Sequence, residues 1–175
     1  MEEARARESL VMTEDRFSRD QPWALWREAA KLPVIDHAIA LLYDDMAQVI
    51  RDKAPVCWAS GRCCNFNAYG HLLYVTGLEI AWFLSKLNEG KSDDAWTSRL
   101  DLKSPCPFQV NNLCTTHAIR PLGCRIYFCQ RGTEEWQHEV YEIFQSRLRQ
   151  LHDEHALPYR YMEWRGGLME ATAET

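Results

Sequence analysis

The sequence lacks any long hydrophobic run, and its first residues carry no apolar leader segment. No stretch of 18 apolar residues occurs in the 175-residue chain, and a membrane-spanning helix needs about that length. Residues 1–16 are charged throughout, unlike a secretory signal. We therefore expect a cytoplasmic protein without membrane association, in a compartment where thiols stay reduced.

Positive charge and glycine-rich motifs are also scarce. The net charge of −5 argues against nucleic acid as a partner. The glycines Gly61, Gly70 and Gly77 are too scattered to form a nucleotide-binding loop. No pair of nucleophile and base is recognisable, so the catalytic residues, if there are any, are unknown. The partner we expect is a protein or redox partner that the sequence does not identify.

Cysteine is absent from most of the chain and is concentrated in two segments, residues 57–64 and 106–129. An odd number of cysteines would leave one unpaired in a disulfide framework, and ordinary buried cysteines would not be clustered. We therefore predict that the two segments meet around a metal centre. The preferred ligands are Cys64, Cys106, Cys114 and Cys124, and the further candidates are Cys57, Cys63 and Cys129.

The cysteine spacing favours an iron–sulfur cluster over zinc. Structural zinc sites usually use closely spaced cysteine pairs, and only Cys124 and Cys129 approach that spacing. An iron–sulfur cluster can take one thiolate from each of several loops, so a [4Fe–4S] cluster is preferred, with zinc as the alternative. We also consider His117 as a zinc ligand, and we expect Arg120 and Arg125 to offset the negative charge of the centre.

The hydrophobic pattern predicts a mainly helical single domain. Helices are expected from Pro22 to Pro33, over 34–53 and 77–90, and over 134–152 with Val140, Ile143 and Phe144 inward. Thr76 and Glu79 form a capping box, and residues 108–114 resemble a hairpin turned at two asparagines. Residues 71–75 and 159–164 are possible short strands. We divide the chain into an arm (1–18), one metal-binding domain (19–165) and a flexible tail (166–175).

The cysteine segments together resemble a known family. The pieces are CWASGRCC, then VTGLEIAWFL, then SPCPFQVNNLCTTHAIRPLGCRIYFC, over about residues 57–129. This combination resembles the YkgJ-type cysteine-cluster proteins, whose domain is described as chelating zinc or iron. The spacing between Cys57 and Cys63 is longer than is usual in that family, and Thr115, Thr116 and His117 replace its common Ile-Tyr.

The resemblance implies metal binding and does not imply an activity. It leaves three hypotheses: an iron–sulfur protein with a redox, sensing or enzyme-associated role; a zinc-binding structural or interaction module; and an enzyme. One branch of the family is linked to flagellin lysine methylation. The enzyme hypothesis is therefore an enzyme related to protein lysine methylation.

Overall fold

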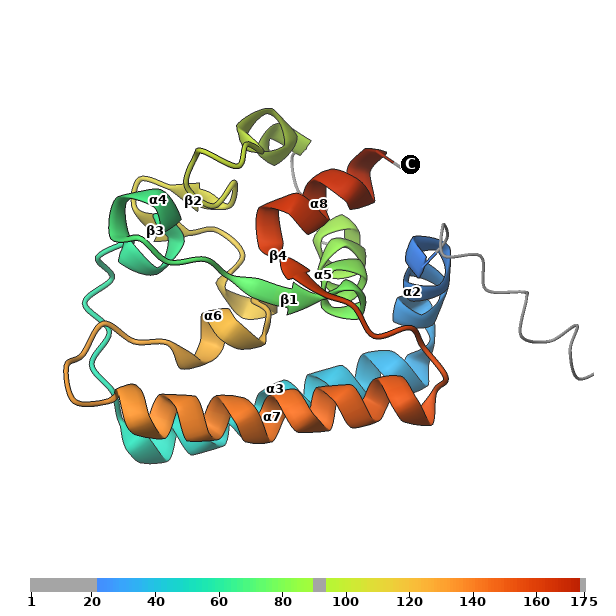
Figure 1. Ribbon diagram of the computed structural model, residues 1–175, viewed down its shortest axis with the longest axis horizontal. Coiled ribbons are helices and arrows are strands. Elements are labelled where there is room, and N and C mark those ends of the chain that lie inside the picture. The colour runs from blue at the N-terminus through green and yellow to red at the C-terminus, as the bar shows by residue number, and fades with distance from the viewer. Residues whose placement is uncertain (1–21, 90–93, 174–175) are drawn as a thin grey trace, which may run out of the picture.

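The computed structural model describes residues 22–89 and 94–173, and it is mainly helical (Figure 1). The predicted arm at residues 1–18 lies outside the described residues. The α-helices are α2 (Pro22–Lys31), α3 (Pro33–Lys53), α4 (Phe66–Tyr69), α5 (Gly77–Glu89), α6 (Leu122–Ile126), α7 (Glu134–Glu154) and α8 (Trp164–Ala173). The 3₁₀ turns are η1 (Arg62–Cys64), η2 (Asp94–Arg99) and η3 (His117–Ile119), and the strands are β1 (Tyr74–Thr76), β2 (Gln109–Val110), β3 (Leu113–Cys114) and β4 (Tyr161–Glu163).

The two longest helices, α3 and α7, lie side by side and form one layer of the molecule (Figure 1). Apolar residues at helical spacing explain this, because each helix presents one buried stripe. The stripe of α3 includes Ile35, Ile39 and Met46. On α7, Val140 and Phe144 are buried as predicted, whereas Ile143 is 59% exposed and that prediction was wrong. Ile143 precedes Phe144 by one residue, which turns it about 100° away from the stripe.

Helices α2, α5 and α8 form the other layer around a tryptophan-rich core. Trp23, Trp26 and Trp164 are almost completely buried. Gly77, at the start of α5, lies directly against the Trp26 ring, and a β-carbon there would overlap the ring. Within the described residues, no helix combines the length and apolar character that crossing a bilayer requires.

A short antiparallel pair, β1 and β4, joins the two layers. Val75 pairs with Met162 at its centre. The capping box at the start of α5 is confirmed, because the Thr76 N–H donates to Glu79 Oε2 at 2.8 Å and the Glu79 N–H donates to Thr76 Oγ1 at 3.2 Å. Both strands fall where the sequence indicated them, but their pairing was not predicted.

The C-terminal segment differs from the predicted flexible tail at 166–175. Helix α8 runs from Trp164 to Ala173 and buries Gly167, Leu168 and Ala171 against the core. The Gly166-Gly167 pair suggested a mobile end. Instead, Gly167 allows α8 to approach Ile80 and Met162 more closely than a side chain would permit.

Candidate cysteine site

The two cysteine segments are hydrogen-bonded to each other. The Cys106 N–H donates to the Cys64 carbonyl at 2.7 Å, and Gln109 Nε2 donates to the Gly61 carbonyl at 2.7 Å. Gly61 has a φ of +72° and faces the hairpin so closely that a β-carbon would lie 2.6 Å from Gln109 Nε2. Glycine at this position therefore allows the two loops to meet.

Five of the seven cysteines line one small cavity of about 30 Å³. They are Cys63, Cys64, Cys106, Cys114 and Cys124. The rest of its wall is mainly aromatic and includes Phe66, Phe83, Phe108 and Trp164. The cavity has room for about one small molecule the size of water. The structure therefore brings together thiols that are up to 61 residues apart in the sequence.

Different local elements present these thiols. Turn η1 carries Cys63 and Cys64, and strand β3 carries Cys114. The β2–β3 hairpin turns at Asn111 and Asn112, whose φ values of 51° and 63° fit the tight hairpin turn that the sequence predicted. Cys124 lies in the short helix α6, which the hydrophobic pattern did not predict. The buried Glu79 carboxylate accepts a hydrogen bond from the Leu122 N–H at 2.9 Å and so fixes the start of that helix.

The Cys64 thiol is at the centre of the sulfur contacts. Its sulfur lies 3.9 Å from that of Cys63, and it also interacts with the thiols of Cys106 and Cys114. These contacts raise the pKa of Cys64 and lower the pKa of Cys63 and of Cys114 to about 6 each. The pKa of Cys106 is lowered for the same reason. Because Cys64 has one S–H proton, it cannot donate to all three neighbours at once.

Several donors point at the same sulfurs. Thr116 Oγ1 lies 3.7 Å from Cys114 Sγ, and the Thr116 backbone N–H also favours the Cys114 thiolate. The Phe108 N–H does the same for Cys106. The Trp164 indole N–H is fully buried at the cavity wall and has no hydrogen-bond partner among the described groups. Its position nevertheless favours the thiolate form of Cys106. These donors fit a site for negatively charged sulfur.

The two predicted arginines have different positions. Arg120 lines the cavity, and its charge lowers the pKa of Cys63 and Cys114. Arg125 lies behind it: its Nε donates to the Arg120 carbonyl at 2.6 Å, and its guanidinium lies 4.1 Å from the centre of the Tyr43 ring. Burial lowers the pKa of Arg125. Arg120 therefore acts on the thiols directly, whereas Arg125 supports the backbone that carries Arg120.

Three predicted candidates lie outside the small cavity. Cys57 is exposed in the loop before η1, and Cys129 is exposed in the loop after α6. His117 is exposed in η3, and partial burial together with the nearby arginines lowers its pKa. As the side chains are placed, no group of three or more His, Cys, Asp or Glu in the described part of the chain could hold a metal ion. The five thiols share a cavity without forming a closed set of ligands.

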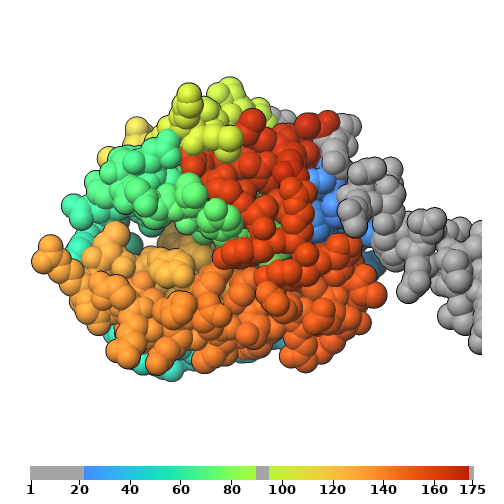
Figure 2. All heavy atoms as spheres, viewed as in Figure 1, coloured from blue at the N-terminus to red at the C-terminus, as the bar shows by residue number. Residues whose placement is uncertain are grey.

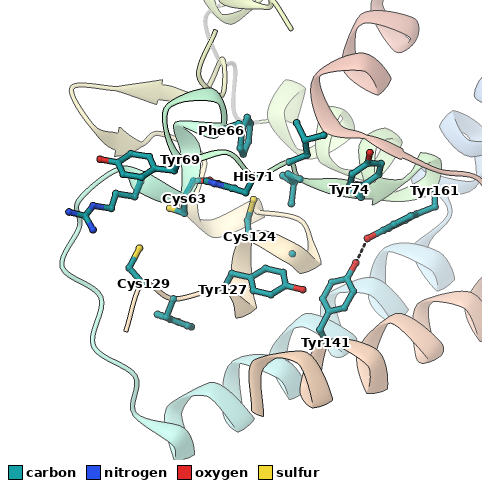
Figure 3. Close-up of a pocket in the computed structure, with 15 residues that line it drawn as sticks. Cys63, Phe66, Tyr69, His71, Tyr74, Cys124, Tyr127, Cys129, Tyr141 and Tyr161 are labelled. Atoms are coloured by element: carbon teal, nitrogen blue, oxygen red, sulfur yellow. Dashed lines mark hydrogen bonds between the residues drawn. The ribbon is translucent and has the colours of Figure 1, made fainter. Parts of the chain in front are cut away.

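A second, larger cavity of about 480 Å³ adjoins the first, and sequence reasoning missed it. Cys63, Phe66 and Cys124 belong to the walls of both. Figure 3 shows the cysteines on one side of this cavity and the hydrogen-bonded pair Tyr141 and Tyr161 on the other. Its remaining residues are Arg62 in η1, Tyr69, residues 71–74, Gly123 in α6 and residues 127–129 in the loop after α6. No pattern in the sequence links these residues, because they are adjacent only after folding.

No family model matches the chain, and no curated protein or solved structure is significantly similar to it. The resemblance to the YkgJ-type proteins therefore stays a prediction.

Proposed function

We propose that this protein binds a metal ion through cysteine thiolates and that a single zinc ion fits the site best. The observation that carries the proposal is the shared cavity of Cys63, Cys64, Cys106, Cys114 and Cys124. Four of these thiols, those of Cys64 and its three neighbours, are the ligands we expect. Cys124 is the fifth thiol and lies half-buried in the same cavity wall.

The sulfur spacing supports a single ion. Four thiolates around one zinc at about 2.3 Å form a tetrahedron whose edges are about 3.8 Å. The Cys63–Cys64 sulfur separation is 3.9 Å, close to that edge. In a [4Fe–4S] cluster each cysteine binds a different iron, so the cluster itself separates the sulfurs. The cavity of about 30 Å³ also suits an ion better than a cluster of eight atoms. Binding would require side-chain rotations that bring the sulfurs of Cys106 and Cys114 to the ion, because the thiols as placed do not form a ligand group.

The chemistry of the walls supports the same proposal. Zinc with four thiolates carries a charge of about −2, which must be offset when water is excluded. Arg120 supplies a positive charge, and the Trp164 indole supplies an N–H donor without a partner. Because the ligands come from separate loops, metal binding would stabilise the folded arrangement of those loops.

An iron–sulfur cluster is the second candidate, and one observation favours it. The thiols of Cys64, Cys106, Cys114 and Cys124 come from four separate segments, without the closely spaced pairs that zinc sites usually use. The loops would then have to move apart to admit the cluster. Its role would be electron transfer, sensing or support of an enzyme. A role in protein lysine methylation stays a further proposal, carried only by the resemblance.

Metal analysis of protein prepared without oxygen tests the proposal. We expect about one zinc per chain and no visible absorption. The variant Cys64→Ser should bind zinc at least about tenfold more weakly, because it removes the central ligand. The matched control Cys57→Ser changes an exposed cysteine outside the cavity and should bind as the unchanged protein does. Circular dichroism checks that each variant folds, and Cys114→Ser replaces Cys64→Ser if the latter does not.

Each outcome decides between the candidates. If the protein contains iron and acid-labile sulfide and absorbs in the visible range, the iron–sulfur cluster is the correct candidate and zinc is refuted. Equal loss of zinc in Cys57→Ser and Cys64→Ser would place the ion elsewhere. If the protein binds neither zinc nor iron and all of its thiols are free, the proposal of a metal centre is refuted.

A further inference from the structure

The larger cavity opens to the surface beside the cysteine site. In Figure 2 the molecule is hollowed between the segment that leads from α4 into β1 and the chain that enters α7. Its volume of about 480 Å³ is in the range of small-molecule sites. The walls come from η1, α4, β1, α6, α7 and β4, together with the loops at residues 71–73 and 127–129.

Exposed apolar side chains gather at this cavity. Tyr69, Leu72, Tyr74, Tyr127 and Tyr161 all line it, and each is between 42% and 52% exposed. Single exposed apolar residues are normal on a protein surface, but a group around a concave opening marks a binding site. Tyr74 stacks on Tyr161 with ring centres 5.4 Å apart, and Tyr127 lies 5.6 Å from Tyr141. The wall therefore offers several aromatic faces.

The polar groups of the cavity are mostly tyrosine hydroxyls and cysteine thiols, with His71 and Arg62 also in the wall. The hydroxyls of Tyr141 and Tyr161 are hydrogen-bonded to each other, and burial raises the pKa of both tyrosines. The negative charge of the buried Glu79 behind them raises both pKa values further. Among the described residues that line the cavity there is no carboxylate, and Arg62 is exposed at its edge. This arrangement disfavours an anion at the tyrosine end, and no carboxylate of the described wall offers a cation a counter-charge there.

We propose that this cavity binds an uncharged, planar aromatic molecule that carries a phenolic or carbonyl oxygen. Its ring lies against the tyrosine faces, and its oxygen exchanges hydrogen bonds with the Tyr141 and Tyr161 hydroxyls. The molecule then lies against Cys63 and Cys124, which also belong to the cysteine site. This inference goes beyond the proposed metal site and does not depend on which metal is bound there.

Titration of the purified full-length protein with four matched probes tests this inference. The probes are 2-naphthol, its saturated analogue 2-decalol, the anion 2-naphthoate and the cation 2-naphthylmethylammonium, each measured by isothermal calorimetry. We expect 2-naphthol to bind most tightly and at a single site. The saturated alcohol should bind at least about tenfold more weakly, because it cannot stack on aromatic rings.

Two variants locate the binding. Leu72→Trp adds bulk at the cavity wall and should weaken 2-naphthol binding at least about tenfold. The control Leu102→Trp makes the same change at a residue of similar exposure outside this wall and should leave binding unchanged. Tyr141→Phe keeps the ring, removes one hydroxyl and should weaken binding about three- to tenfold.

The opposite results overturn the inference. Equal binding by the two tryptophan variants would show that the probe binds elsewhere. A tighter complex with the cation or the anion would refute an uncharged ligand, and the absence of binding by all four probes would refute an aromatic site. Failure of the metal proposal is seen separately, because metal content is measured independently of these titrations.

Discussion

Replacing Glu79 by glutamine tests how the fold holds the cysteine site. Glu79 is 1% exposed, and four hydrogen bonds reach its carboxylate. Tyr43 Oη donates at 3.1 Å and the Leu122 N–H at 2.9 Å to Oε1; the Thr76 N–H donates at 2.8 Å and Thr76 Oγ1 at 3.1 Å to Oε2. Burial raises the pKa of Glu79, and these bonds oppose that rise. One carboxylate thus joins α3, β1, α5 and α6.

The magnitude of the effect follows from this geometry. In Glu79→Gln the amide oxygen still accepts two hydrogen bonds. The amide NH₂ replaces the other carboxylate oxygen, so two donors of the protein face its hydrogens and have no acceptor. Each donor left unsatisfied in the interior costs about 1–3 kcal/mol. Removal of a buried charge returns part of that cost. We therefore expect a loss of about 2–4 kcal/mol in the free energy of unfolding, which lowers Tm by roughly 5–15 °C in a domain of this size.

Thermal and urea unfolding followed by circular dichroism at neutral pH measure this loss. The control Glu139→Gln removes an exposed carboxylate from α7 and should change stability by less than about 0.5 kcal/mol. Because Leu122 begins the helix that carries Cys124, Cys124 should also react faster with a thiol reagent in Glu79→Gln. A loss no greater than that of the control would refute the view that an ionised Glu79 holds these elements together.

Three further changes probe the loops around the site, each measured by the shift in Tm. Gly61→Ala should destabilise the protein by about 1–3 kcal/mol and weaken metal binding, because the new β-carbon meets Gln109 Nε2 at 2.6 Å; unchanged metal affinity would contradict this. Asn112→Val should cost about 1–2 kcal/mol because of its positive φ, whereas Asn112→Gly should be tolerated. Arg165→Lys should cost about 1–3 kcal/mol, because one ammonium cannot replace the bonds to the Ser104 carbonyl and to Glu163; a neutral result would mean that the buried Arg165 does not tie α8 to the cysteine loop.

Local patterns predicted most of the elements correctly. The apolar stripes of α3 and α7, the capping box at Thr76 and the asparagine turn of the hairpin each depend on residues within a few positions of one another. The errors arose where a longer-range contact decides the outcome. Helix α8 forms despite Gly166 and Gly167 because the core accepts its buried face, and α6 forms where a buried carboxylate accepts its first N–H.

The candidate site likewise combines features that local sequence predicts with features that depend on long-range packing. The clustering of cysteines in the sequence predicted that segments 57–64 and 106–129 would meet, and the hydrogen bond between Cys106 and Cys64 shows that they do. Spacing alone could not separate the five cysteines at the cavity from Cys57 and Cys129. The packing of the two loops separates them, because it places five of the thiols at the wall of one cavity and leaves Cys57 and Cys129 outside it.

Periodicity, turn residues and local composition act over short distances, so the helical character of the chain and its two cysteine-rich loops follow from the order of the residues alone. Tertiary structure alone decided which sulfurs share a cavity, which arginine reaches them and that a tyrosine-lined pocket lies beside them. The physical reason is that these neighbours are set by the packing of α6, α7 and the β1–β4 pair, which brings together residues far apart in the chain.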